Sequence, residues 1–111
     1  MLLFFRAGFW LAVGVTLYLT LRPAVAITTM SDKTQHLISF GVLTLLAGLA
    51  YPRARLLPLG IVLSGLGAII ELLQPFSGRT NDIKDWIADT AGVLLAIFSV
   101  WTWRRLTSRL D

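Results

Sequence analysis

The chain has 111 residues, of which 56% are hydrophobic and only 14% are charged, and its mean hydropathy is +0.75. Soluble domains carry about 25% charged residues, so the composition excludes an ordinary soluble domain and indicates a membrane protein of one domain, residues 1–111. The formal charge is +4, but the arginines flank apolar runs instead of forming a stripe, so we expect no nucleic-acid partner. The absence of cysteine excludes disulfides, thiolate metal sites and cysteine nucleophiles.

Four apolar runs predict an all-α, polytopic membrane protein that folds as a compact bundle of four transmembrane helices. The predicted helices cover roughly residues 4–21, 36–51, 56–73 and 86–103. The short loop between the second and third runs predicts an antiparallel helical hairpin.

The predicted spans are short, and this places carboxylates near the membrane. The charge-free run before Glu71 has about 15 residues, or about 22 Å of helix, against the ~30 Å of a hydrocarbon core. Glu71 and Asp89 are therefore expected at or inside the membrane boundary, unless the bilayer thins or charged ends reach out of it. In the fourth helix, small residues recur every four positions and permit close helix approach, at Ala88, Gly92 and Ala96.

Lysine and arginine positions predict the orientation of the bundle in a bacterial inner membrane, with both termini in the cytoplasm. The predicted cytoplasmic side carries Arg6, Arg53, Arg55, Arg104, Arg105 and Arg109. The predicted outer side carries Arg22, Lys33, Arg79 and Lys84, next to most of the acids. A cleavable signal peptide ending at 24–26 is the alternative for the first run, although that run is long for one.

Two polar segments share the outer end in this topology. Asp32 and His36 are four positions apart, which places both on one face of the second helix. The acids Asp82, Asp85 and Asp89 continue into the stripe of small residues, so they point into the bundle, where ionisable groups indicate a functional site. The candidate binding residues are Lys33, His36, Glu71, Gln74, Arg79, Asp82 and Asp85, and the candidates for a catalytic role are His36, Asp32, Glu71 and Asp85.

These residues also have ordinary structural explanations. Asp32 and Asp82 are suited to cap the N-termini of the second and fourth helices. Gln74 is suited to satisfy a helix end, and Arg79 and Lys84 are suited to anchor the protein at the membrane interface. The choice between a ligand site and a polar contact that holds four helices together therefore stays open at this stage.

The order of these residues resembles the VanZ-like family of small bacterial integral membrane proteins. The resemblance covers about residues 32–97, with one transmembrane helix ahead of it. Its motifs are Asp32-Lys33-x-x-His36-x-x-x-Phe40, Glu71-x-x-Gln74, Arg79-x-x-Asp82-x-x-Asp85 and Gly92. Members commonly carry Asn where this chain has Asp89, so the chain adds a charge at the membrane boundary. The resemblance implies a role in the bacterial cell envelope, and the family takes its name from a glycopeptide antibiotic resistance component linked to teicoplanin.

The first functional hypothesis is a non-catalytic envelope component, lipid-associated or related to antibiotic resistance, with membrane lipids as partners. The alternative is a binder or enzyme of an anionic, phosphate-bearing envelope lipid. In that alternative Lys33, Arg79 and Lys84 hold phosphate oxygens, and His36 acts as nucleophile or general acid–base.

Two further hypotheses have less support from the sequence. A divalent-metal site would use Glu71, Asp82, Asp85 and His36, with oxygen ligands that suit Mg²⁺ or Ca²⁺. Their spacing matches no recognised metal signature, so we expect no cofactor and no metal. Transport would require an oligomer, because four short helices enclose little volume.

Overall fold

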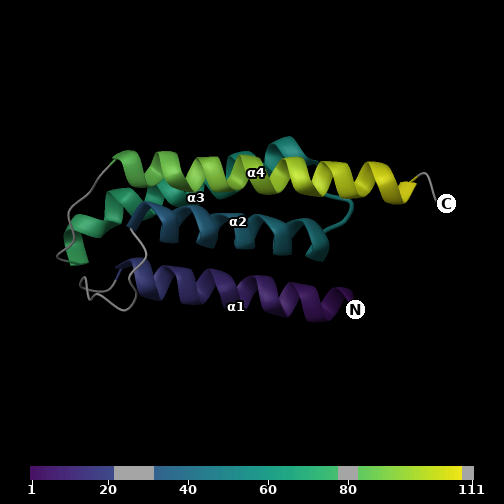
Figure 1. Cartoon of the computed structure of the whole chain (residues 1–111). Coiled ribbons are helices and arrows are strands. Elements are labelled where there is room, and N and C mark those ends of the chain that lie inside the picture. Colours follow the sequence, from purple (N-terminus) through teal and green to yellow (C-terminus); the bar gives the residue numbers. More distant parts are fainter. Residues whose placement is uncertain (22–31, 78–82, 109–111) are drawn as a thin grey trace.

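The computed structural model of the protein describes residues 1–21, 32–77 and 83–108, and the side chains of Asp32 and Ser77 lie outside that description. The described residues form four α-helices and one short 3₁₀ helix, and they contain no strand (Figure 1). In chain order these are α1 (Leu2–Leu21), α2 (Asp32–Ala50), α3 (Leu56–Leu73), η1 (Gln74–Ser77) and α4 (Ile83–Ser108). The prediction of an all-α membrane bundle of four helices is confirmed. The signal-peptide alternative, with its cleavage site at 24–26, lies outside the described residues.

Three of the helical segments are long and apolar enough to cross a membrane. They are α1, the continuous segment Leu56–Phe76, and α4. Helix α2 does not meet this criterion within the described part of the chain, because its first turns carry Asp32, Lys33 and His36 ahead of an apolar remainder. The bundle thus combines three apolar helices with a fourth that has a polar beginning.

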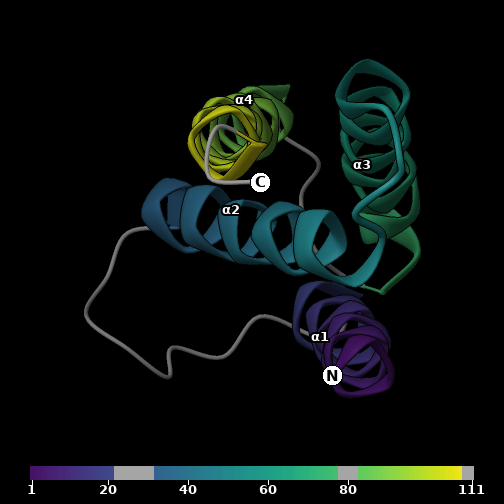
Figure 2. The same cartoon turned by 90° about the vertical axis from the view of Figure 1, so that its right-hand side faces the viewer.

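Helix α2 lies in the middle of the bundle. It packs most extensively against α4 and also contacts α1 and α3. Figure 2 shows α2 between α1 and α4 and running obliquely to both of them. Figure 1 shows that α1 begins and α4 finishes at one end of the bundle, which we call the opposite end. At the other end, the polar end, α1 and α3 finish and α2 and α4 begin.

Helix α4 turns a continuous buried stripe toward its neighbours. The stripe begins with Asp85 and Asp89 and continues through Gly92 and Ala96. A Cβ added at Gly92 would collide with the carbonyl oxygen of Leu37, so α4 and α2 touch through their backbones at this point. The packing face predicted from the small residues is therefore confirmed, and the two acids at its start lie inside the bundle.

Two arginines close the opposite end of the bundle around the C-terminus of α2. Arg6 Nε donates a hydrogen bond of 3.0 Å to the Ala50 carbonyl, and its guanidinium lies 4.8 Å from the centre of the Tyr51 ring. Arg104 donates hydrogen bonds of 2.7, 3.2 and 3.3 Å to the carbonyls of Ala54, Tyr51 and Gly48. The last carbonyls of a helix have no partner within it, so these two side chains satisfy the end of α2.

Candidate functional site

Ionisable and amide side chains are buried together at the polar end of the bundle. They come from the start of α2, the end of α3 and the start of α4. We call them the polar cluster, and its members, with their exposed fractions, are His36 (4%), Glu71 (6%), Gln74 (1%), Asp85 (3%) and Asp89 (0%). Charged groups are almost never buried this completely unless they are paired, so the contacts inside the cluster decide what it can do.

His36 lies at the centre of the polar cluster and faces two carboxylates of α4. Its Nδ1 lies 2.7 Å from Asp89 Oδ1, a hydrogen bond between two buried side chains. When Asp89 is ionised it can only accept, so Nδ1–H is then the donor in this contact. Nε2 lies 3.7 Å from Asp85 Oδ2, which is too far for a hydrogen bond. Asp89 therefore holds the ring of His36 with Nε2 on the side of Asp85.

Lys33 connects the buried cluster with the surface of the polar end. Its Nζ lies 2.7 Å from Asp85 Oδ1, while 43% of the Lys33 side chain is exposed. The two oxygens of Asp85 thus face different partners, because Oδ1 pairs with Lys33 and Oδ2 faces His36. Lys84, in the first turn of α4, is exposed as well. At this end the described cations lie outward and the carboxylates lie inward.

The end of α3 supplies the remaining two members of the cluster. His36, Glu71 and Asp85 each offer one atom suited to bind a metal ion, and these three atoms lie within 4.8 Å of one another. Gln74, the first residue of η1, donates a hydrogen bond of 3.1 Å from Nε2 to the carbonyl of Thr20 in the last turn of α1. Gln74 therefore provides a hydrogen-bond donor for a carbonyl at the end of α1. The sequence did not indicate this partner, because Gln74 follows α3 in the chain. All four helices meet at the polar cluster.

The second oxygen of Asp89 lies against the backbone of α3. A Cβ added at Gly67 would lie 2.8 Å from Asp89 Oδ2, so only a residue without a side chain leaves room for this carboxylate. Oδ2 is buried and has no hydrogen-bond partner among the described residues. Asp89 is therefore tied to His36 through one oxygen and packed against α3 through the other.

The structure brings together five of the residues that the sequence singled out as candidates. Lys33, His36, Glu71, Gln74 and Asp85 all belong to the polar cluster or contact it. Arg79, Asp82 and the side chain of Asp32 lie outside the described residues, so their predicted roles stay predictions. The sequence pointed to Asp89 as a departure from the family pattern, and the helical spacing from Asp85 was the signal for its place in the cluster.

Among the hollows lined by described residues, a small one touches the polar cluster and a larger one lies away from it. A cavity of about 60 Å³ lies between α1 and α2, lined by His36 together with Thr16, Thr20, Gln35 and Ser39. It is far smaller than the pockets of about 300–1,000 Å³ that hold organic ligands.

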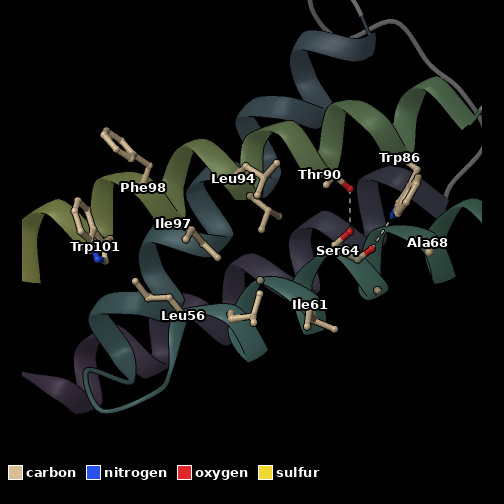
Figure 3. Close-up of a pocket in the computed structure, with 14 residues that line it drawn as sticks. Leu56, Ile61, Ser64, Ala68, Trp86, Thr90, Leu94, Ile97, Phe98 and Trp101 are labelled. Carbon is tan, nitrogen blue, oxygen red and sulfur yellow. Dashed lines mark hydrogen bonds between the residues drawn. The ribbon is translucent and has the colours of Figure 1, made fainter.

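The larger hollow is an apolar groove of about 760 Å³ between α3 and α4, shown in Figure 3. Its polar contacts join the two helices: Trp86 Nε1 donates to the Ser64 carbonyl at 2.9 Å, and the hydroxyls of Ser64 and Thr90 are 2.9 Å apart. The rest of the lining is largely apolar, as a surface that faces lipid requires. The groove therefore indicates no ligand by itself.

The fold and the polar cluster define a polytopic all-α membrane protein with ionisable side chains buried at one end of its bundle. Within this class, the family model described as VanZ/LLP1 matches residues 13–104, and the chain therefore belongs to the VanZ/LLP1 family. Comparison with curated proteins and comparison with solved structures each found no match. The family suspected from the order of the polar residues is thus confirmed.

Proposed function

We propose that this protein is a non-catalytic, lipid-associated component of the bacterial cell envelope, embedded in the inner membrane with both termini in the cytoplasm. The observation that carries the proposal is the arrangement of charge at the polar end. Lys33 pairs with the buried Asp85 and still exposes 43% of its side chain. The cluster is therefore closed toward the bundle and presents cations toward the membrane boundary.

The closed interior supports a role without catalysis. His36 and Asp85 expose 4% and 3% of their surface, and Asp89 exposes none. The described helices bury these side chains, which leaves little of their surface for a lipid headgroup to contact. Removing one partner from a buried, charged contact is strongly destabilising, so the contacts of His36 hold the oblique α2 against α4.

The exposed cations support association with anionic lipid. Lys33 and Lys84 are the described cations at the polar end, and both reach the surface. A lysine keeps its ammonium in the headgroup region while its stem covers apolar surface, which places it next to lipid phosphate. Each basic residue near an anionic membrane surface contributes about 1 kcal/mol of attraction. Two such residues favour anionic over neutral lipid by at most about 30-fold, because Asp85 offsets part of the charge of Lys33.

The test is lipid retention by the purified protein. Full-length protein is reconstituted with equal amounts of phosphatidylglycerol and phosphatidylcholine, re-extracted, and its bound lipids are counted by native mass spectrometry. The double variant Lys33→Gln, Lys84→Gln is expected to lose the preference for phosphatidylglycerol. The matched control is Arg53→Gln, Arg55→Gln, which removes the same charge from exposed residues at the opposite end. An equal loss in both variants would show general charge attraction and refute a specific association at the polar end.

The second candidate is catalysis by His36 on a phosphate-bearing envelope lipid. The observation that favours it is the hydrogen bond from Nδ1 to Asp89, which leaves Nε2 basic as a general base or nucleophile requires. Phosphate release from a lipid phosphate by the reconstituted protein, abolished in His36→Gln, would establish this activity and overturn the non-catalytic proposal. We expect no release by either protein, because the cluster is closed.

A contribution to glycopeptide resistance would follow from a changed envelope. It is measured as the teicoplanin susceptibility of a bacterial host that expresses the chain or its Lys33→Gln, Lys84→Gln variant. Equal susceptibility with and without the chain would show that this protein does not contribute to teicoplanin resistance.

A further inference from the structure

We infer that His36, Glu71 and Asp85 form a binding site for one divalent transition-metal ion of the Mn²⁺ to Zn²⁺ series. This inference does not depend on the lipid association proposed above. It departs from the expectation, based on sequence spacing, that the chain uses no metal.

The donor set and its spacing fit one ion. Three helices contribute an imidazole nitrogen and two carboxylates, and their donor atoms lie within 4.8 Å of one another. Nitrogen and oxygen ligands lie about 2.0–2.2 Å from zinc, so two ligands of one ion are separated by at most about 4.4 Å. The 3.7 Å between His36 Nε2 and Asp85 Oδ2 is within that limit. A small rotation of the side chains would bring donor atoms that are up to 4.8 Å apart within this limit.

The orientation of His36 is the one that a metal ligand needs. A histidine that binds a metal almost always donates its other ring N–H to a carboxylate or carbonyl, which holds the ring in place. His36 Nδ1 makes this contact with Asp89 Oδ1 at 2.7 Å. Nε2 then faces Asp85. If the two side chains were simply hydrogen-bonded, Nε2 and Oδ2 would lie about 2.9 Å apart instead of 3.7 Å.

The balance of charge gives an independent reason for a cation. Asp85 and Asp89 lie on two sides of one imidazole, and Lys33 Nζ pairs with Asp85 Oδ1. Asp85 Oδ2 faces His36 Nε2 on the side away from Asp89. Burying carboxylates is costly, and a dication beside His36 lowers that cost. Imidazole favours zinc-like ions and carboxylates favour manganese. One imidazole with two carboxylates therefore favours an ion of the Mn²⁺ to Zn²⁺ series over Ca²⁺.

The decisive experiment measures metal in the full-length protein, purified in detergent with a tag that contains no histidine. Wild-type protein is stripped with EDTA, dialysed against Zn²⁺ or Mn²⁺, and analysed for metal content and melting temperature. We expect about one ion per chain, together with a melting temperature that falls on stripping and recovers when the ion returns. These two measurements need no variant, so a variant that fails to fold does not affect them.

Variants then assign the ligands. Glu71→Gln preserves shape and is expected to reduce bound metal to the level of stripped protein. Asp89→Asn keeps an acceptor for His36 Nδ1–H, so it is expected to bind metal with no more than the tenfold to hundredfold loss typical of groups that orient a ligand. As a spectroscopic check, loading with Co²⁺ gives a visible absorption band that His36→Gln shifts or removes.

Two results would overturn the inference. One is wild-type protein with no more metal than Glu71→Gln and with the same melting temperature before and after EDTA. The other is an absorption band for Co²⁺ that His36→Gln leaves unchanged. Neither result affects lipid retention through Lys33 and Lys84, so the two proposals fail separately.

Discussion

Replacing Gly92 by alanine tests whether α2 and α4 touch backbone to backbone. The added Cβ would collide with the Leu37 carbonyl oxygen and lie 3.1 Å from Gly41 N. Backbone atoms of a helix cannot rotate away as a side chain does, so the two helices must separate. Overpacking of this kind costs about 1–3 kcal/mol. Because α2 and α4 share the most extensive interface in the bundle, we expect the upper part of that range.

Two other glycines provide a graded control for the same substitution. Gly65→Ala on α3 places its Cβ where no atom lies within 4 Å, so we expect a gain of up to about 1 kcal/mol from the better helix propensity of alanine. Gly41→Ala places its Cβ at an ordinary contact distance of 3.6 Å from the Gly92 carbonyl, and its stability should fall between the two.

The assay is unfolding of the purified protein by SDS in detergent micelles, followed by circular dichroism. The three variants should unfold in the order Gly92→Ala, Gly41→Ala, Gly65→Ala. A Gly92→Ala protein as stable as Gly65→Ala would refute the close approach of α2 and α4.

Two further predictions concern single side chains and use the same SDS titration. Arg104→Gln removes guanidinium hydrogen bonds to the end of α2 and should cost about 1–3 kcal/mol, whereas Arg105→Gln, an exposed neighbour stacked on a tryptophan, should stay within about 0.5 kcal/mol. Equal effects of the two arginine substitutions would show that the hydrogen bonds of Arg104 do not stabilise the end of α2. Trp86→Phe loses the bond to the Ser64 carbonyl and should cost about 1 kcal/mol, and more than Trp10→Phe, whose indole bond is exposed. A larger loss at Trp10 would contradict this ranking.

The helices and their membrane setting could be predicted from the sequence, because apolar runs of membrane length need no tertiary information to be recognised. The inward face of α4 could be predicted as well, since Asp85, Asp89, Gly92 and Ala96 follow helical spacing. The central, oblique position of α2 could not. Its place depends on which neighbours its faces meet, and a one-dimensional pattern does not contain that information.

The two arginines at the opposite end, Arg6 and Arg104, also have one role that the sequence predicted and one that it did not. Sequence reasoning used Arg6 and Arg104 as charges that orient the protein in the membrane. The structure adds a second role, since both donate hydrogen bonds to carbonyls around the end of α2. These partners lie more than 40 positions away in the chain, so no local pattern signals them.

By itself, the sequence determined that this is a helical membrane protein of the VanZ type with its acids gathered near one end, because composition, run length and motif order are properties of the chain. Only the tertiary structure decided that His36 faces Asp85 and Asp89 while Glu71 lies close by. These side chains belong to three different helices. Their separation depends on how α2 crosses its neighbours, and the contact between the backbones at Gly92 makes that close crossing possible.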